Sequence, residues 1–385
     1  MTKILKLNAI SPLADGIFEG CEYSDAVKNP DGIMVRSANM AEYAVNDNLL
    51  AVARAGAGTN NIPSAEYAEK GIVVLNTPGA NANAVKELVI CELFLGGRKF
   101  TEAVEWVQTL KGEGESVPKL VEKGKGKFVG CEISGKTLGV IGLGAIGALV
   151  ANSAYALGMN VVCVDPKLTV STALTLANGI KIVQTREELF KVADFITVHV
   201  PLLPDTKGMF NAQSIALMKD GVVIINNSRG ELVDSDDMIA ALESGKVERY
   251  ITDFPEDKLI GVKNAICVPH LGASTPEAED NCAVMAANQL KDYIVNGNIV
   301  NGVNYPSVSL PRTSVARVCV HHRNIKEVLS KILAVISSKS INVAHMADQS
   351  KGEYAYLILE LDDTPDAADM KAIANIEGVI RARLI

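Results

Sequence analysis

A glycine-rich segment in the middle of the chain limits the available folds more than any other feature of the sequence. The run Val140-Ile141-Gly142-Leu143-Gly144-Ala145-Ile146-Gly147 contains the pattern Gly-x-Gly-x-x-Gly. It follows the apolar, strand-like run Thr137–Gly142 and opens a helix rich in small residues that ends near Gly158. A second strand-like run then ends in Asp165. Strand, glycine turn, helix, strand and acidic residue in this order predict a dinucleotide-binding β-α-β unit.

Each glycine of this motif has a separate physical task. Gly142 allows the tight turn, Gly144 lets the backbone approach a pyrophosphate, and Gly147 lets helix and strand pack closely. The start of the helix offers free N–H groups and a partial positive charge to the phosphates. Asp165 accepts hydrogen bonds from ribose hydroxyls and repels a 2′-phosphate. The motif therefore predicts NAD rather than NADP; the alternative is a structural glycine turn followed by a surface aspartate.

The composition excludes several classes of protein. The 385 residues are too many for one ordinary domain, so two or three are expected. A net charge of −8 argues against a broad surface for nucleic acid or an anionic membrane, but leaves room for a small basic pocket. No segment resembles a signal peptide, and no run approaches the roughly 18 apolar residues of a membrane span. The 7 scattered cysteines predict reduced thiols in a cytoplasmic protein, and no metal site is expected.

The rest of the chain alternates strand-like and helix-like segments. In the first eighty residues, strands are expected at Ile4–Leu7, Gly32–Val35, Leu50–Arg54 and Ile72–Leu75, with a helix over Ala65–Lys70. A long helix follows from Asn81, and after it strands are expected at Thr137–Gly142, Asn160–Val164, Lys181–Val183, Phe195–Val198, Gly221–Asn226 and Ala265–Val268. This rhythm predicts two parallel α/β units, the second inserted into the first.

The composition changes near residue 300. A loop without periodicity, residues 303–312, is interpreted as a linker. After it we expect strands over 314–321, 341–348, 353–361 and 378–385, and helices over 324–337 and 366–373. The first of these helices has one apolar face at helical spacing. The order βαββαβ predicts a ferredoxin-like domain over residues 313–385.

Polar residues follow three of the predicted strands, where open α/β sheets place their chemistry. They occur in His199-Val200-Pro201, in Asn226-Asn227-Ser228-Arg229-Gly230 and in Val268-Pro269-His270-Leu271-Gly272-Ala273-Ser274-Thr275. With the dinucleotide motif before them, these segments resemble the D-2-hydroxyacid dehydrogenase family over nearly the whole first 300 residues. The resemblance implies a split flavodoxin-like substrate domain (1–80 and 273–302), an inserted Rossmann NAD-binding domain (81–272) and a C-terminal α+β ferredoxin-like domain of the ACT type.

The resemblance also implies roles for individual residues. Arg229 would clamp the substrate carboxylate with its planar fork of donors. His270 would exchange a proton with the 2-hydroxyl while hydride moves to nicotinamide. Glu256 is the predicted carboxylate partner of this histidine, and Asp257 is the alternative. Asp253 would lie on the nicotinamide side.

The complete predicted cofactor site combines the motif with these loops. His199 is either a cofactor-lining residue or a structural histidine at a strand end. The predicted NAD-binding residues are Gly142, Gly144, Ala145, Ile146, Gly147, Asp165, His199, Val200, Pro201, Asn227, Ser228, Arg229, Asp253, His270, Gly272 and Ala273.

Segments of the first domain resemble the substrate loops of family members that oxidise D-3-phosphoglycerate. Arg36 and Arg54 follow strands, where they would bind a distal phosphate or, alternatively, form surface salt bridges. Lys86 is either a further phosphate ligand or a solvated helix charge. The predicted substrate-binding residues are Arg36, Ser37, Arg54, Ala57, Gly58, Asn81, Arg229 and His270. A hydroxypyruvate or glyoxylate reductase is the nearest alternative, and an NAD-sensing corepressor-type protein is a third.

The C-terminal segment resembles the effector site of serine-binding ACT domains. His322, Asn324 and Asn342 match positions that hold an amino acid there, usually across a two-fold interface. Lys326-Glu327 replaces the usual Pro-Gly, and Asn324 as an ordinary helix cap is the alternative. The resemblance thus implies L-serine as an effector and a homodimer or homotetramer, because the family pairs through its cofactor domain.

Overall fold

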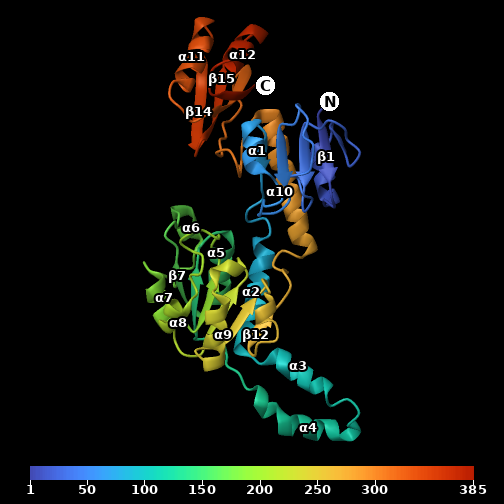
Figure 1. Ribbon diagram of the computed structural model, residues 1–385, viewed down its shortest axis with the longest axis vertical. Helices are drawn as coiled ribbons and strands as arrows, with labels where there is room; N and C mark the ends of the chain where they lie inside the picture. Colours follow the sequence, from blue (N-terminus) through green and yellow to red (C-terminus); the bar gives the residue numbers. More distant parts are fainter. The chain divides into compact units, whose positions relative to one another are not determined.

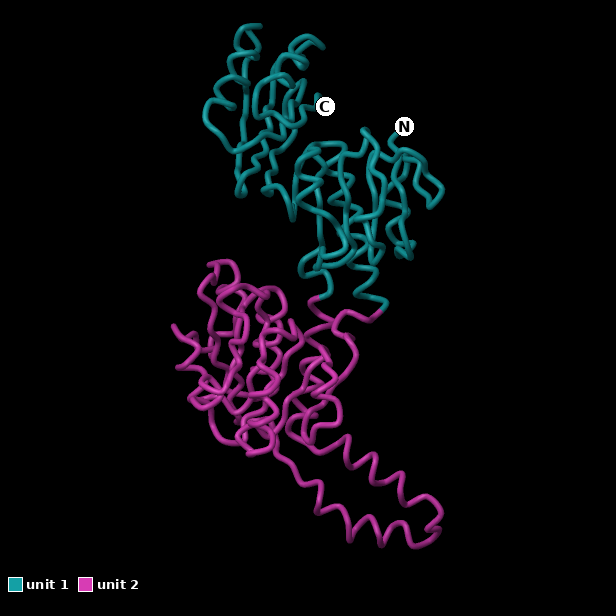
Figure 2. Tube along the Cα trace, in the orientation of Figure 1, with its two compact units in different colours: residues 1–81, 276–385 teal, residues 82–275 magenta.

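The computed structural model describes residues 1–385 and divides into two units (Figure 2). The first unit contains residues 1–81 and 276–385, and the second contains residues 82–275. The chain returns to the first unit at Pro276, three residues later than the sequence predicts, because Pro276 opens a long helix. No helix combines the length and apolar character needed to cross a membrane.

The second unit is built on a seven-stranded parallel sheet in the order β12-β11-β10-β9-β6-β7-β8. Its strands are β6 (Thr137–Ile141), β7 (Asn160–Val164), β8 (Lys181–Ile182), β9 (Phe195–Val198), β10 (Val222–Asn226), β11 (Val247–Thr252) and β12 (Ala265–Cys267). Strand β7 pairs with one edge of β6 and β9 pairs with its other edge, so the strand order reverses at β6. Ligands bind at such a reversal of strand order, outside the carboxyl ends of the strands.

Helices cover both faces of this sheet, which is why its strands are almost continuously apolar. Helices α2 (Ala82–Gly97) and α5 (Ala145–Ala156) share one core with the sheet. The opposite core contains α7 (Arg186–Val192), α8 (Ala212–Ala216) and α9 (Ser235–Ser244), while the short α6 (Val170–Thr175) has no buried residue. Figure 1 shows α3 (Phe100–Gln108) and α4 (Val117–Gly124) extending from the unit as an arm.

Strand β11 is absent from the expectations based on sequence. Its central residues Glu248 and Arg249 interrupt the apolar run that identified the other strands. Arg249 is nevertheless 2% exposed, because its guanidinium pairs with Glu102 on α3 at 2.5 Å. Because Glu102 neutralises its charge, Arg249 can occupy a buried position in β11.

The first unit contains a five-stranded parallel sheet in the flavodoxin-like order β2-β1-β3-β4-β5. Its strands are β1 (Lys3–Leu7), β2 (Glu22–Ser24), β3 (Gly32–Val35), β4 (Ala51–Arg54) and β5 (Val73–Leu75), with α1 (Ser64–Glu69) before β5. Helix α10 (Pro276–Asn296) packs on β3, β4 and β5 (Figure 1). Segments far apart in the sequence thus share one core; the three-residue β2 was not expected.

The C-terminal domain has the ferredoxin-like order βαββαβ that is consistent with an ACT domain. Its antiparallel sheet, in the order β14-β15-β13-β16, consists of β13 (Ala316–Arg323), β14 (Val343–Lys351), β15 (Tyr354–Leu361) and β16 (Val379–Leu384). Helices α11 (Val328–Ser338) and α12 (Ala367–Ala374) cover one face. The other face shares a core with α10 and the loop after it.

The segment interpreted as a linker is a packed part of the first unit. Asn304 donates its side-chain hydrogen bonds to the carbonyls of Ser64 and Ile72, and accepts one from the backbone of Val74. Tyr305 is fully buried and donates to the carbonyl of Ala68. The absence of periodicity between residues 303 and 312 therefore marks an irregular but fixed segment, since side chains satisfy its neighbours' backbone groups.

Candidate active site

The turn after β6 forms a cradle of open backbone. Gly142 has φ 91°, and a Cβ there would lie 2.5 Å from the carbonyl oxygen of His199. Gly147 has no room for a side chain because the carbonyl of Gly142 faces it. Gly144 faces open space and precedes α5 without a side-chain cap. The first N–H groups of the helix, including those of Ala145 and Ile146, therefore have no partner within it, and the cradle suits a pyrophosphate.

Asp165 connects this cradle to the end of β7. Its Oδ2 accepts a 2.7 Å hydrogen bond from the backbone of Leu143, and its Oδ1 accepts one of 2.8 Å from Lys167. The carboxylate is half-buried and fixed by two backbone donors beside the glycine turn. Its position beside the cradle suits the predicted contact with a ribose.

His199 follows β9 and closes the base of the cradle. Its Nε2 lies 3.0 Å from the hydroxyl of Thr197, and its Nδ1 is buried with no hydrogen-bond partner. Burial lowers the pKa of His199 to about 4, so the ring is neutral near pH 7. Val200 lies against Gly142, whereas Pro201 is exposed. An unpartnered buried nitrogen next to the cradle is more easily explained by a ligand than by a structural role.

The loop after β10 presents Arg229 to solvent. The side chain of Asn226 donates to the carbonyl of Arg229 at 2.8 Å and accepts from the backbone of Ser228 at 3.1 Å. The hydroxyl of Ser228 donates to the carbonyl of Val198 at 2.7 Å. The loop is thus fixed to two neighbouring strands, while the guanidinium of Arg229 donates only to the adjacent Ser228 carbonyl. Its remaining donors are available to a carboxylate.

Asp253 is the buried carboxylate on which the charge of His270 acts in this structure. It is 1% exposed; its Oδ2 accepts from the backbone of Gly272 at 3.4 Å, and its Oδ1 has no partner. Burial raises the pKa of Asp253, and the charges of His270 and Arg229 oppose that increase. The ring of His270 lies tilted against that of Phe254, with the ring centres 4.7 Å apart, and the residue is exposed. Asp253, Arg229 and His270 therefore form one electrostatic cluster.

The predicted hydrogen bond between Glu256 and His270 is not formed in this structure. Glu256 instead accepts a 3.0 Å hydrogen bond from the hydroxyl of Ser235, and its other oxygen lies near Gly230. The alternative, Asp257, is exposed at the start of a short 3-10 helix, Asp257–Leu259. Glu256 lies next to the loop of Arg229 and stays a prediction as the histidine's partner.

Glu92 belongs to this cluster, although its sequence position did not indicate it. It lies on α2, is 1% exposed, and accepts a 2.6 Å hydrogen bond from the side-chain amide of Asn227. Burial raises the pKa of Glu92 to about 8, with the Asn227 hydrogen bond opposing and the charge of Asp253 adding. The available signal was its helical spacing with the apolar residues Val85 and Val89, which places a carboxyl on a buried face.

The predicted substrate residues of the first unit gather at the carboxyl ends of β3 and β4. Arg54 donates from Nε to the side chain of Asn61 at 3.2 Å, and burial lowers its pKa, with Arg36 also contributing. Arg36 pairs with Glu279 on α10 at 2.5 Å. The nearby loop is partly open: Ser37 and Ala57 are exposed, and Gly58 and Asn81 are half-buried. The charge of Arg36 thus acts on Arg54, while Glu279 pairs with Arg36.

The predicted effector residues do not meet within one chain. His322 contacts Asp348 at 3.2 Å, and Asn324 donates to the carbonyl of Gly352 at 3.2 Å. Asn342 lies beside Asp362 at the opposite end of the sheet. Helix α11 also begins at Val328 rather than Asn324, because Glu327 has φ 69°. Asn324 is therefore no helix cap.

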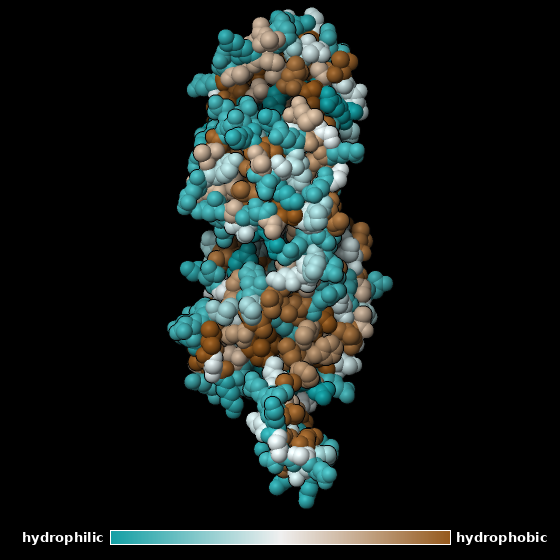
Figure 3. Space-filling view, turned by 90° about the vertical axis from the view of Figure 1, so that its right-hand side faces the viewer, coloured by the Kyte–Doolittle hydropathy of each residue, from teal (hydrophilic) through white to brown (hydrophobic).

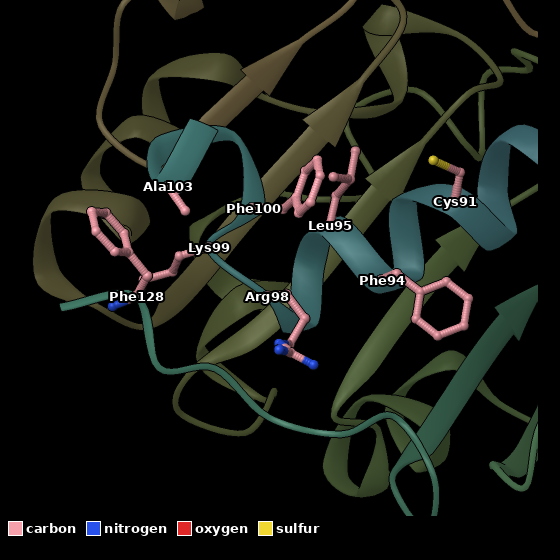
Figure 4. Close-up of a pocket in the computed structure, with 8 residues that line it drawn as sticks. All are labelled: Cys91, Phe94, Leu95, Arg98, Lys99, Phe100, Ala103 and Phe128. Atoms are coloured by element: carbon pink, nitrogen blue, oxygen red, sulfur yellow. The ribbon is translucent and has the colours of Figure 1, made fainter. Parts of the chain in front are cut away.

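A separate apolar groove of about 560 Å³ lies where α2 meets the arm (Figure 4). Its lining residues are Cys91, Phe94, Leu95, Arg98, Lys99, Phe100, Ala103 and Phe128, none of which was a predicted site residue. The aromatic side chains of Phe94 and Phe100 are 46% and 63% exposed. Figure 3 shows apolar residues gathered on the side of the second unit next to the arm.

Comparisons with known proteins agree with the predicted resemblance. Residues 96–272 match the NAD-binding domain of the D-isomer specific 2-hydroxyacid dehydrogenases. The chain is 32% identical to a D-3-phosphoglycerate dehydrogenase of Haemophilus influenzae, over 95% of this chain and 89% of that protein. It is 31% identical to D-3-phosphoglycerate dehydrogenase 1 of Saccharomyces cerevisiae, over 96% of this chain and 84% of the relative. The solved NAD+-bound 3-phosphoglycerate dehydrogenase of Entamoeba histolytica is 27% identical, with a TM-score of 0.59 over 79% of this chain and 98% of its own.

Proposed function

The chain belongs to the D-isomer specific 2-hydroxyacid dehydrogenase family of NAD-dependent enzymes, and from that premise we propose that it oxidises D-3-phosphoglycerate to 3-phosphohydroxypyruvate. This reaction is the first step of serine biosynthesis by the phosphorylated route. The observation that carries the choice of substrate is the pair of arginines, Arg36 and Arg54, at adjacent strand ends of the first unit. Relatives similar over nearly their whole length carry the same activity in their names.

The residues of the second unit supply the groups that this oxidation needs. Bound NAD+ provides the hydride acceptor. Arg229, held by its loop with free donors, binds the substrate carboxylate and polarises the adjacent carbon–oxygen bond. His270 takes the proton of the 2-hydroxyl as the carbon–hydrogen bond gives up its hydride. Asp253 stabilises the imidazolium that results, because the charges of the buried Asp253 and of His270 attract each other.

The cofactor site combines the cradle with the polar strand ends. Gly142, Gly144 and Gly147 leave the backbone open to the pyrophosphate, and Asp165 binds the adenosine ribose. The remaining predicted contacts come from the loops after β9, β10 and β12. We assign the ribose contact to Asp165 as the reason for preferring NAD.

A reductase of unphosphorylated 2-oxo acids is the second candidate, and one observation favours it. Glu279 pairs with Arg36 at 2.5 Å and so weakens the positive charge that a phosphate would need. NADH oxidation with phosphohydroxypyruvate, hydroxypyruvate and glyoxylate decides between the two functions. We expect kcat/KM to be highest for phosphohydroxypyruvate; a preference for hydroxypyruvate or glyoxylate would replace the proposal, and no turnover at all would favour the corepressor-type protein.

For the assembly, we propose a homodimer formed through the cofactor-binding unit, with a homotetramer as the larger alternative. The exposed apolar groove beside the arm and the exposed residues Val104, Val107 and Val129 support this surface. Sedimentation of the purified chain is the direct test. A monomer at micromolar concentration would contradict the proposal.

For regulation in the cytoplasm, we propose that L-serine binds between the C-terminal domains of two copies. His322 and Asn324 of one copy would face Asn342 of another, because within one chain they lie at opposite ends of the sheet. Binding regulates only if serine prefers a less active arrangement. Calorimetry and inhibition assays with millimolar L-serine test this proposal. The absence of both binding heat and inhibition would refute it.

A further inference from the structure

Glu92 is a buried carboxyl group beside the proposed catalytic residues that the mechanism above does not use. It is 1% exposed on α2, and its Oε2 accepts a 2.6 Å hydrogen bond from Nδ2 of Asn227. Its Oε1 has no hydrogen-bond partner. Desolvating a carboxyl group in this way costs free energy, particularly when it is ionised. A structural role alone would not require a carboxyl at this position.

Three acceptor oxygens of adjacent side chains lack a donor here: Oε1 of Glu92, Oδ1 of Asn227 and Oδ1 of Asp253. Asn227 and Asp253 directly follow β10 and β11, which are neighbours in the sheet. Each buried unsatisfied group lowers stability, and such groups persist in native proteins mainly where function needs them. The carboxyl ends of these two strands therefore form a site for a ligand that offers N–H groups or positive charge.

The charged group that acts on Glu92 is Asp253, which follows β11. Asp253 acts on Glu92, and His270 and Arg229 act on Asp253 in turn. Strand β10 carries no titratable side chain, and that of α5 is the exposed Tyr155. On β11, Arg249 is paired with Glu102, while Glu248 points to solvent. Burial, followed by the charge of Asp253, raises the pKa of Glu92 to about 8, which favours the protonated form near neutral pH.

We propose that Glu92 is a positioning residue that holds a proton when the reduced cofactor is bound and releases it to solvent when the oxidised cofactor is bound. This rests on the proposed function: His270 accepts the substrate's proton, so the nicotinamide that accepts hydride from the same carbon lies within one small substrate of His270 and hence near Asp253. The ring is cationic in NAD+ and neutral in NADH. Positive charge there offsets the repulsion between the carboxylates of Asp253 and Glu92, and the O–H bond of Glu92 breaks. With NADH, the proton returns from solvent.

Calorimetry of NAD+ and NADH binding to the full chain, in phosphate and in Tris buffers, measures the protons released. The test variant is Glu92→Gln, which keeps shape and hydrogen bonding without the ionisable group. The control is Glu87→Gln on the same helix, whose side chain is 64% exposed. The wild type and the control are expected to release more protons with NAD+ than with NADH. Their preference for NAD+ over NADH should rise about tenfold between about pH 7 and about pH 9.

The Glu92→Gln variant is expected to lose both the difference in proton release and the pH dependence of the cofactor preference. Equal proton release by Glu92→Gln and wild type, or no difference between the cofactors in the wild type, would overturn the inference. Infrared difference spectra of the wild type test it even if the variant does not fold. The carbonyl band of a protonated carboxylic acid should disappear when NAD+ is added, and its persistence would also overturn it. Proton linkage without phosphoglycerate turnover would support the inference while refuting the proposed substrate, whereas failure to bind either cofactor would refute both.

Discussion

The cofactor-binding unit and the C-terminal domain differ in how many of their buried polar side chains have hydrogen-bond partners. In the former, side-chain atoms of Glu92, His199, Asn227 and Asp253 are buried without partners near the carboxyl ends of the strands. In the latter, the fully buried Arg317 pairs with Glu360 and also donates to the carbonyls of Asn296 and Leu310. His322 is likewise paired, with Asp348, and one unpartnered buried atom remains there, Nδ1 of His321.

This difference indicates which part of the molecule is prepared to bind a ligand. Unsatisfied buried groups lower stability unless a ligand completes them, so they mark a site that is prepared before binding. Satisfied groups fix the C-terminal domain to the substrate domain. Arg381 donates to the carbonyls of Asp47 and Leu49, and Arg323 pairs with Glu69.

The largest effect is expected at the prepared site. His270→Ala should lower kcat by about 10²–10⁴-fold, because the proton of the 2-hydroxyl loses its acceptor. NADH affinity should change by less than about threefold, since the cradle at Gly142 lies on other strands. Steady-state kinetics and NADH fluorescence titration measure the two effects. Turnover close to that of the wild type would mean that the cluster around Asp253 serves another purpose.

In the C-terminal domain, the largest expected effect concerns stability. Arg317→Met should lower the free energy of unfolding by about 3–5 kcal/mol, because Glu360 stays buried without its partner. Urea denaturation followed by circular dichroism measures it. The double variant Arg317→Met/Glu360→Leu should be less destabilised than the single one. Lys331→Met, which removes the exposed pair with Glu327, should lower stability far less. Equal losses in both single variants would contradict the importance of the buried pair.

The sequence predicted the elements that depend on local pattern and missed those that depend on contacts through space. The glycine motif and the apolar strands are local signals, so the cofactor cradle and most of both parallel sheets were anticipated. Strand β11 was missed because Arg249 is neutralised by Glu102 from another element. Glu92 was missed because a glutamate on a helix usually faces water. The start of α11 was wrong because nothing in the composition reveals the positive φ of Glu327.

The histidine's partner depends on contacts that a sequence does not give. The family resemblance implied Glu256, which stays a prediction; in this structure Glu256 accepts a hydrogen bond from Ser235, and the charge of His270 acts on the buried Asp253. Spacing along one loop does not show which groups the loop contacts in the fold. The packed segment of Asn304 and Tyr305 was misread for a similar reason, since its partners lie in α1 and beside β5.

The substrate site of the first unit is a third region to compare, and there we expect an effect of intermediate size on KM. Arg54→Gln should raise the KM for phosphohydroxypyruvate about 10–100-fold, the value of one charge-assisted contact. The KM for hydroxypyruvate should change less than about threefold. Lys28→Gln, an exposed substitution in the same unit, is the control. Equal increases for both substrates would assign Arg54 a structural role through Asn61.

The smallest expected effect concerns His322. Its pKa is set mainly by hydrogen-bond partners, whereas that of Glu92 is set mainly by burial. Burial lowers the pKa of His322, but the hydrogen bonds to Asp348 and to the Arg323 carbonyl outweigh it, so the pKa is raised. A raised pKa in the folded state stabilises the fold below the unfolded value, near about pH 6.5, and this contribution is lost as pH rises through the folded value. His322→Gln should therefore be less stable than the wild type by up to about 1 kcal/mol in mild acid and nearly equal to it in mild base. Urea midpoints across that range measure the difference, with the exposed His345→Gln as control. A difference that grows with pH would show that His322, like Glu92, is governed by desolvation rather than by its partner.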